Sequence, residues 1–287
     1  MPELPEVETI RRELKPVIIG RRIERVKVLW PKTVAPTSAR RFQTSLRGQT
    51  VTGLGRRAKI LLIKLANNLT LTIHLKMTGQ LIYRHSEYQI VGGHPQAGGA
   101  DNLPNRFTRL VLDFDNRGQL FFNDARKFGW SRLLTGADQA ELIRHFGPEP
   151  LTRDFSQNYL AQLAARYPRR PIKALLLDQT LIAGLGNIYA DESCFRAGLQ
   201  PARLAGSLKP ANTARLHQAI QQILKLAISK KGTSARDYRR PNGQQGNFAD
   251  LLQVYGRGGK PCLVCRQIVI KNRLVRRGTH SCPRCQH

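Results

Sequence analysis

The first six residues, MPELPE, place two reactive groups side by side. Removal of Met1, which is usual before a small residue, would leave Pro2 with a free secondary α-amine. An α-amine has an ordinary pKa near 8, against about 10.4 for a lysine, so more of it is neutral and nucleophilic at physiological pH. Such an amine can attack a sugar or carbonyl carbon and form a Schiff base, with Glu3 as the neighbouring acid. The alternative is that Pro2 only begins a helix, and these six residues alone do not exclude it.

Near the C-terminus, two C-x-x-C pairs supply four candidate metal ligands: Cys262, Cys265, Cys282 and Cys285. Their spacing is typical of a tetrahedral zinc site with four thiolate ligands. Because such a site keeps no open position, we expect one structural Zn²⁺ ion rather than a catalytic one. Between the pairs, residues 267–276 should fold back as a basic hairpin around residues 271–273, which the metal would stabilise. Four cysteines without a metal are the alternative.

Three further motifs combine turns with cations or aromatic rings. In LIAGLGNIY (residues 181–189), two glycines permit tight turns and Asn187 can cap the next helix, which suits a phosphate. In HLKMTG (residues 74–79), Met77 lies on a turn at a strand end, and NDARKFGW (residues 123–130) mixes cations with aromatic rings. An apolar residue among cations can be a wedge for a base stack. Taken alone, however, each of these last two motifs favours ordinary core, and LIAGLGNIY could equally be a plain helix corner.

The charge balance of the chain indicates its partner. The 287 residues include 47 Lys and Arg against 19 Asp and Glu, a net charge of +28 spread along the whole length. So basic a protein needs a polyanion, and nucleic acid is the first candidate. An anionic membrane is the alternative, disfavoured because we find neither a long amphipathic basic helix nor an apolar run of membrane-spanning length. The N-terminus does not resemble a secretory signal, and the paired cysteines favour a reducing compartment.

The hydrophobic pattern predicts a helix followed by a β-rich region. After Pro5, the residues Val7, Ile10 and Leu14 have helical spacing, and the opposite face is polar, with Glu6, Glu8, Arg11 and Arg12. Residues 22–134 then predict a β-sandwich, through strands at 22–29, 59–65, 69–75, 80–83, 109–114, 119–123 and 130–134. Residues 86–105 have no period and are expected to be a mobile excursion from the sheet.

From residue 135 the pattern becomes helical. We expect helices at 137–146, 155–165 with Asp154 as cap, 171–177, 187–197 and 208–230. The expected organisation is a β-sandwich domain at 1–134, a hinge at 135–153, a helical domain at 154–250 and a zinc hairpin at 251–287. Residues 232–248 form a long connector without a period, which is either functional or disordered.

Together these motifs make the chain similar to the bacterial formamidopyrimidine-DNA glycosylases of the formamidopyrimidine/endonuclease VIII-like superfamily. The resemblance covers essentially the full length, in the family's order. It rests on PELPEVETIRREL, RRAKILL, HLKMTGQL, NDARKFGW, LLDQTLIAGLGNIYADE, GTSARDY, VYGRGGKPC and RGTHSCPRCQ. It implies an α+β multidomain fold, with an N-terminal β-sandwich and flanking helix, a helix–two-turns–helix domain and a zinc-finger β-hairpin.

The resemblance also implies a base-excision repair enzyme. Such an enzyme removes oxidised purines, chiefly 8-oxoguanine and formamidopyrimidines, from duplex DNA and cuts the strand by β- and δ-elimination. The catalytic residues implied are Pro2 as nucleophile at C1′, Glu3 as acid on the deoxyribose, Lys59 in the elimination, and Arg277 on the lesion phosphates and in δ-elimination. Met77, Arg126 and Phe128 would fill the hole left by the extruded base, with Arg126 on the opposite cytosine.

Other implied DNA contacts come from three groups of residues. They are the phosphate-binding residues Arg169, Lys173 and Asn187, the pocket-lining Glu6 and Glu192, and Thr233, Ser234 and Tyr238 of the loop over the extruded base. We expect a monomer in the bacterial cytoplasm, at the nucleoid, with no membrane partner.

One position departs from the family pattern, and two alternatives stay open. Phe107 stands where many members carry a histidine, which puts the DNA contact of that histidine in doubt. The first alternative is a non-catalytic zinc-ribbon DNA-binding protein on the same scaffold. The second is endonuclease VIII-type specificity for oxidised pyrimidines, although GTSARDY and the Met77, Arg126 and Phe128 pattern favour the purine branch.

Overall fold

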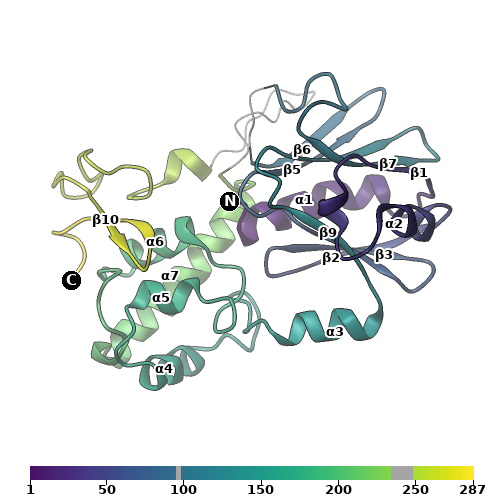
Figure 1. Cartoon of the computed structure of the whole chain (residues 1–287). Helices are drawn as coiled ribbons and strands as arrows, with labels where there is room; N and C mark the ends of the chain where they lie inside the picture. Colours follow the sequence, from purple (N-terminus) through teal and green to yellow (C-terminus); the bar gives the residue numbers. More distant parts are fainter. Residues whose placement is uncertain (95–97, 234–247) are drawn as a thin grey trace. The chain divides into compact units, whose positions relative to one another are not determined.

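The computed structural model describes residues 1–94, 98–233 and 248–287 (Figure 1). The chain forms two compact units. Unit 1 comprises Met1–Arg144 and the described part of Lys230–Asn247, and unit 2 comprises His145–Ser229 and Phe248–His287. Ser234 and Tyr238 lie outside the described residues.

Unit 1 is built on two antiparallel sheets. The five-stranded sheet has the order β1-β7-β8-β5-β6 and the four-stranded sheet the order β2-β3-β4-β9. The strands are β1 (Ile23–Val28), β2 (Val51–Arg57), β3 (Ile60–Leu65), β4 (Thr70–His74), β5 (Gly79–Arg84), β6 (Gln89–Gly93), β7 (Thr108–Phe114), β8 (Gln119–Asp124) and β9 (Trp130–Leu134). The predicted β-sandwich is confirmed, and the seven predicted strands are all present. The sequence pattern missed β2 and β6, because glycines at both weaken the alternation of apolar residues.

Helices close both open sides of the sandwich. Helix α1 (Leu4–Ile18) packs along the edge strands β6 and β2, one from each sheet. At the opposite side, α2 (Ala39–Leu46) packs on β1, and the short helix η1 (Pro31–Val34) packs on β9 and β1. Their apolar side chains join those of both sheets in one core.

The polar stretch at 86–105 has a structural role that its composition did not indicate. Besides strand β6, it supplies Leu103 and Ala100, which pack on Ile82, Val111 and Phe121 at the outer face of the five-stranded sheet. This cover buries Val111 of β7, whereas Leu110, Leu112 and Phe114 of the same strand belong to the core between the sheets.

Unit 2 is helical, with a β-hairpin. Its helices are α4 (Gln157–Arg166), α5 (Ile172–Leu177), α6 (Asn187–Arg196) and α7 (Pro210–Ser229), with η2 (Ala205–Ser207) and η4 (Phe248–Leu251). The hairpin consists of β10 (Ile270–Leu274) and β11 (Arg277–Ser281), and α6 packs against β11. Helix α3 (Gly136–Arg144) ends unit 1. No helix in the described parts of the chain is long and apolar enough to cross a membrane.

Several local details differ from the predictions. Ser156 caps α4 in place of Asp154, because its hydroxyl accepts the Tyr159 N–H. Gly186 is the N-cap of α6, so that Asn187 is the first helical residue. The hairpin turns at Val275 and Arg276, which have positive φ, and not at 271–273.

Helix α1 also buries two carboxylates that were expected on its polar face, Glu6 and Glu8. Glu8 accepts hydrogen bonds from Arg11 and Arg12 of the same helix, and Arg56 of β2 donates to it at 3.3 Å. Burial alone would raise the pKa of Glu8, but the hydrogen bonds and charges of these arginines lower it to about 2. This cluster ties α1 to the four-stranded sheet.

We therefore expect Glu8→Gln to destabilise unit 1 in a pH-dependent way. Because the pKa of Glu8 is lower in the folded than in the unfolded chain, its contribution is complete above about pH 4.5 and is lost as the pH falls towards 2. Urea unfolding of both proteins between pH 2 and pH 7 measures this difference. A stability gap that stays constant down to pH 2 would contradict the assignment.

Candidate active site and nucleic-acid interface

One end of the sandwich in unit 1 gathers several chemically active groups. At this end Ile60 pairs with His74, and His74 pairs with Trp130, in the four-stranded sheet. In the other sheet, Gly79 pairs with Asp124, and Gln80 pairs with Gly93. The loops that begin or end at these positions, together with the N-terminal segment, hold the predicted Pro2, Glu3, Glu6, Lys59, Met77, Arg126 and Phe128.

The N-terminus is fixed by the start of α1. Glu3 is the N-cap of the helix, and its N–H donates to Glu6 Oε2 at 2.9 Å in a reciprocal capping box. Pro2 is buried and the Glu3 side chain is only 1% exposed, whereas Met1 is 37% exposed. A chain end held in this way has little freedom, which suits a nucleophile.

The pKa of the amine at this end is shifted by its surroundings. Burial lowers the pKa of the Met1 α-amine, Glu3 and Glu6 act to raise it, and Lys59 lowers it further. The net shift is downward, so a larger fraction of the amine is neutral at a given pH. After removal of Met1, the amine of Pro2 would lie among the same charged groups.

Lys59 reaches this end through the tight connection between β2 and β3. Arg57 pairs with Ile60, so only Ala58 and Lys59 connect the strands, and Ala58 has a φ of 52°. Lys59 is 5% exposed, and its charge acts on both the N-terminal amine and His74. The structure thus brings the predicted Pro2, Glu3 and Lys59 together.

The sequence analysis assigned no role to His74, although it opens the HLKMTG motif. Burial, with Lys76 and Lys59 nearby, lowers the pKa of His74 to about 3, so that the ring is neutral. Its Nδ1 accepts the Lys76 N–H at 2.9 Å, which places the ring proton on Nε2. His74 is therefore a neutral donor at the same end of the sandwich.

Met77, Arg126 and Phe128 lie on two neighbouring connections between the sheets. Residues 75–78 join β4 to β5, and residues 125–129 join β8 to β9. The Arg126 guanidinium lies over the Phe128 ring, 4.6 Å from its centroid, and Phe128 is 53% exposed. Met77 is half-buried. Phe107 is near this region, since its carbonyl accepts the Asp124 N–H at 2.8 Å.

Glu6 links α1 to the first residues of the predicted lesion-capping loop, 232–248. Its Oε1 accepts the N–H of Thr233 at 2.9 Å and the hydroxyl of Thr233 at 3.1 Å. Gly232 has a φ of 76°, and a Cβ there would lie 2.6 Å from Glu6 Oε1, so the approach requires glycine. Lys231 forms an ion pair with Glu13 at 2.5 Å.

In unit 2, Lys173 is not at the surface where a phosphate contact would require it. The side chain is fully buried and forms an ion pair with Asp191 at 2.6 Å. Its Nζ also donates to Gly278 O and Thr279 Oγ1, each at 2.9 Å. The predicted phosphate contact therefore conflicts with this placement, because the ammonium group is enclosed by partners within unit 2.

Three other predicted residues of unit 2 occupy distinct positions. Asn187 begins α6, and its Nδ2 donates to the same Gly278 carbonyl at 2.9 Å. Arg277 is exposed at the start of β11, next to this anchored carbonyl. Arg169 is exposed between α4 and α5.

Glu192 is buried within unit 2, with an exposure of only 1%. Its carboxylate accepts the backbone N–H groups of Gln253, Val254 and Tyr255 at 2.8 to 3.2 Å. Burial raises the pKa of Glu192, although these three donors oppose the shift. Its observed contacts hold the segment that leads to the hairpin, whereas the sequence predicted a pocket-lining role.

The four paired cysteines converge as a metal site requires. Their sulfur atoms all lie within 4.8 Å of one another, with Cys262 Sγ 3.9 Å from Cys285 Sγ and Cys265 Sγ 3.4 Å from Cys282 Sγ. A zinc ion with Zn–S distances of about 2.3 Å needs S–S separations of about 3.8 Å. The donor set and its spacing therefore fit a tetrahedral ion that Cys262, Cys265, Cys282 and Cys285 would hold.

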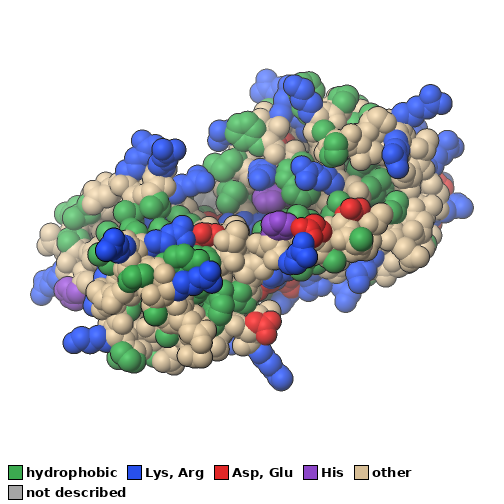
Figure 2. All heavy atoms as spheres, turned by 60° about the horizontal axis from the view of Figure 1, so that its bottom comes forward, with side chains coloured by type: hydrophobic (Ala, Val, Ile, Leu, Met, Phe, Trp, Pro, Cys, Tyr) green, Lys and Arg blue, Asp and Glu red, His purple; other side chains and the backbone are tan. Residues whose placement is uncertain are grey.

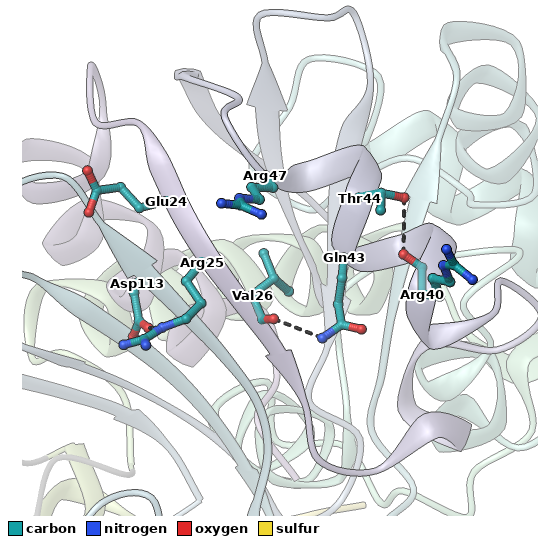
Figure 3. Close-up of a pocket in the computed structure, with 8 residues that line it drawn as sticks. All are labelled: Glu24, Arg25, Val26, Arg40, Gln43, Thr44, Arg47 and Asp113. Carbon is teal, nitrogen blue, oxygen red and sulfur yellow. Dashed lines mark hydrogen bonds and ion pairs between the residues drawn. The ribbon is translucent and has the colours of Figure 1, made fainter.

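A hollow of about 680 Å³ lies elsewhere in unit 1, between β1 and α2 (Figure 3). Its polar groups bind one another: Arg25 pairs with Asp113 at 2.5 Å, and Gln43 donates to the Val26 carbonyl. None of its lining residues is a predicted site residue. The predicted catalytic residues of unit 1 lie instead at the end of the sandwich. Lys and Arg side chains are spread over the visible face of the molecule (Figure 2).

Comparisons with known proteins agree with this organisation. The chain matches the Formamidopyrimidine-DNA glycosylase N-terminal domain over residues 1–131, the Formamidopyrimidine-DNA glycosylase H2TH domain over 146–238, and a zinc finger found in FPG and IleRS over 259–287. Formamidopyrimidine-DNA glycosylases of Pelotomaculum thermopropionicum and Desulfitobacterium hafniense are each 42% identical to it over 289 residues. The matches cover 100% of this chain and 99% and 100% of those proteins.

Solved structures from Lactococcus lactis are similar over the whole chain. A mutant FPG in complex with a Fapy-dG containing DNA has a TM-score of 0.86 and 34% identity, with 100% of both chains covered. Fpg in complex with an abasic site containing DNA has the same TM-score and identity, with 99% of both covered. Since sequence relatives and solved structures agree from end to end, this chain belongs to the formamidopyrimidine-DNA glycosylase family.

Proposed function

We propose that this DNA glycosylase excises oxidised purines from duplex DNA and then cuts the strand by β- and δ-elimination. The observation that carries the proposal is the shared location of the N-terminal amine, Glu3 and Lys59, where burial lowers the pKa of the amine. This combination suits attack on a sugar carbon without any cofactor. We expect the protein to act as a monomer at the bacterial nucleoid.

The proposed reaction starts at C1′ of the damaged nucleotide. The lone pair of the Pro2 amine forms a bond to C1′ as the bond from C1′ to the base breaks, and the base leaves with a proton. Glu3 protonates the ring oxygen, so that the deoxyribose opens and a Schiff base forms. Loss of a C2′ proton then expels the 3′ phosphate, and a second elimination expels the 5′ phosphate. Lys59 assists these proton transfers, and Arg277 binds the phosphates that leave.

Chemistry at C1′ requires the nucleotide to leave the stack, at a cost of a few kcal/mol that is smaller for a damaged base. Met77 and Phe128 would occupy the gap, and Arg126 would reach the cytosine opposite the lesion. The stacked Arg126 and Phe128 side chains form an exposed surface suited to this insertion. The net charge of +28 supplies attraction to the DNA backbone, with a steep dependence on salt.

Lesion choice tests the proposed substrate class. We expect faster excision of 8-oxoguanine opposite cytosine than of thymine glycol, measured by single-turnover cleavage of otherwise identical duplexes. The comparison is informative because Lactococcus lactis FPG has been solved with an oxidized pyrimidine containing DNA, at a TM-score of 0.85 and 34% identity to this chain. Faster cleavage of thymine glycol would instead support the endonuclease VIII-type alternative.

We further propose that the ion held by the four cysteines is Zn²⁺ and that it shapes the hairpin carrying Arg277. Purified protein should contain one zinc per chain by mass spectrometry of the metal. Cys282→Ser should lose zinc and weaken DNA binding, because the hairpin is too small to fold without its metal. Cys194→Ala is the matched control, since the fifth cysteine lies in the helical core and should leave the zinc content unchanged. Full DNA binding by zinc-free protein would refute this role.

For Lys173 we propose a positioning role in place of the phosphate contact expected from the resemblance. Its Nζ and Asn187 Nδ2 both hold the carbonyl next to Arg277, which fixes the start of β11. Lys173→Met would leave Asp191 buried without its cation, so we expect a loss of about 3–5 kcal/mol in unfolding free energy.

Adding Asp191→Asn to Lys173→Met should recover part of that loss, because the neutral amide oxygen can still accept the His280 N–H. Denaturant unfolding of the single and double variants measures both effects. A Lys173→Met protein of unchanged stability that has lost DNA affinity would support the direct phosphate contact instead.

A further inference from the structure

The two connections that carry Met77, Arg126 and Phe128 are held together at both ends. Each connection crosses from one sheet to the other. On one side His74 pairs with Trp130, and on the other side Gly79 pairs with Asp124. The sheets thus fix where the connections start and stop, but strand pairing does not determine the conformation between these points.

A single buried carboxyl group, that of Asp124, joins the two connections. Asp124 is fully buried at the end of β8. Its Oδ1 accepts the hydroxyl of Thr78, which follows Met77, and the N–H of Arg126 at 3.2 Å. Its Oδ2 accepts the N–H of Gly129, which follows Phe128, at 2.6 Å. Thr78 Oγ1 in turn accepts the Arg126 N–H at 3.1 Å, which closes the network.

Asp124 is itself held rigidly by its backbone. Its N–H donates to the Phe107 carbonyl at 2.8 Å, and its carbonyl accepts the Arg109 Nε–H at 2.9 Å. Neither partner belongs to the two connections, so both anchor Asp124 to β7 and the residue before it. The anchored Asp124 side chain can therefore hold Thr78 and Gly129 in fixed positions.

The second connection, residues 125–129, is also closely packed against its surroundings. A Cβ on Gly129 would lie 2.5 Å from the Phe122 ring and 3.1 Å from Asp124 Oδ2, so the close approach of the backbone requires glycine. Lys127 has a φ of 58°, and its Nζ lies 4.0 Å from the centre of the Trp30 ring. Lys127 thus contacts Trp30, whereas Arg126 and Phe128 stack on one another.

We propose that Asp124 is a positioning residue that sets Met77, Arg126 and Phe128 as one preformed unit. The proposal rests on the proposed function, in which these three side chains replace the extruded base. Because the network orders both connections before DNA binds, little conformational freedom has to be lost on insertion. The hydrogen bonds described for Asp124 go to Thr78, Arg126 and Gly129 and to β7 and the residue before it, so its effect should be largest on substrates in which a gap must be filled.

Asp124→Asn tests this selectivity. The amide keeps the size of the side chain but turns one acceptor into a donor, facing N–H or O–H groups that also donate. We expect excision of 8-oxoguanine from a duplex to fall by about tenfold or more, because small misplacements of binding groups strongly reduce rate. Cleavage of a preformed abasic site in single-stranded DNA should stay within about twofold of the unchanged protein, since no opposite strand leaves a gap.

Two pairs of variants separate positioning from folding. Thr78→Val removes the hydroxyl and should reproduce the duplex defect, whereas Thr78→Ser keeps the hydroxyl and should restore activity. Asp113→Asn makes the same chemical change at a carboxylate in the hollow of Figure 3, where Arg25 and Gln119 bind it, and should affect neither substrate. A 2-aminopurine next to the lesion provides a direct readout, because its fluorescence rises when the neighbouring stack is opened.

The outcomes distinguish this inference from the proposed function. An equal loss on both substrates, or no loss on either, would overturn the positioning role of Asp124. So would a normal rise in 2-aminopurine fluorescence in a variant that has lost duplex excision. If the unchanged protein cleaves the abasic site but excises no damaged base from any duplex, then the proposed glycosylase function fails, whatever Asp124 does.

Discussion

The burial of α1 between the edge strands β6 and β2 is the constraint on which the rest of this structure depends. Its apolar residues enter the common core of both sheets, and a Cβ on Gly92 of β6 would lie only 2.3 Å from the Ile10 side chain. Such close packing allows helix α1 only one position along the edges of the two sheets. Because the chain begins directly before this helix, the location of the N-terminal amine follows from packing rather than from a dedicated binding pocket.

Buried carboxyl groups also fix the positions of segments that are expected to contact DNA. Glu6 holds Thr233, Asp124 holds the two connections between the sheets, and Asp191 holds Lys173 behind the hairpin. Two of the side chains expected to contact DNA, the apolar Phe128 and the cationic Arg277, are exposed. Although the protein has few acidic residues, these buried carboxyl groups position segments that carry cationic side chains.

Much of this architecture could be predicted from sequence because it depends on short-range patterns. Strand and helix periods, the C-x-x-C spacing and the N-terminal motif all act locally, and the order of the motifs indicated the family. The partners of buried polar groups could not be predicted, since they come from distant segments. From the sequence, Lys173 was expected to bind phosphate, but in the structure Asp191 and Thr279 enclose it. Glu8 was expected on a polar helix face, but Arg56 of β2 contacts it. Asp124 was missed because its role depends on Thr78 of the other connection, and His74 was missed because its motif does not reveal that the ring is buried.

The most direct test of this account is borohydride trapping on a duplex that contains 8-oxoguanine opposite cytosine, followed by mass mapping of the cross-linked peptide. The account predicts a covalent adduct on the amine of Pro2, in protein that has lost Met1. Such an adduct requires a neutral amine next to an acid, and burial beside Glu3 at the start of α1 shifts the pKa of the N-terminal amine downward. Tight binding to the same duplex without any adduct, or an adduct on a lysine instead, would contradict it.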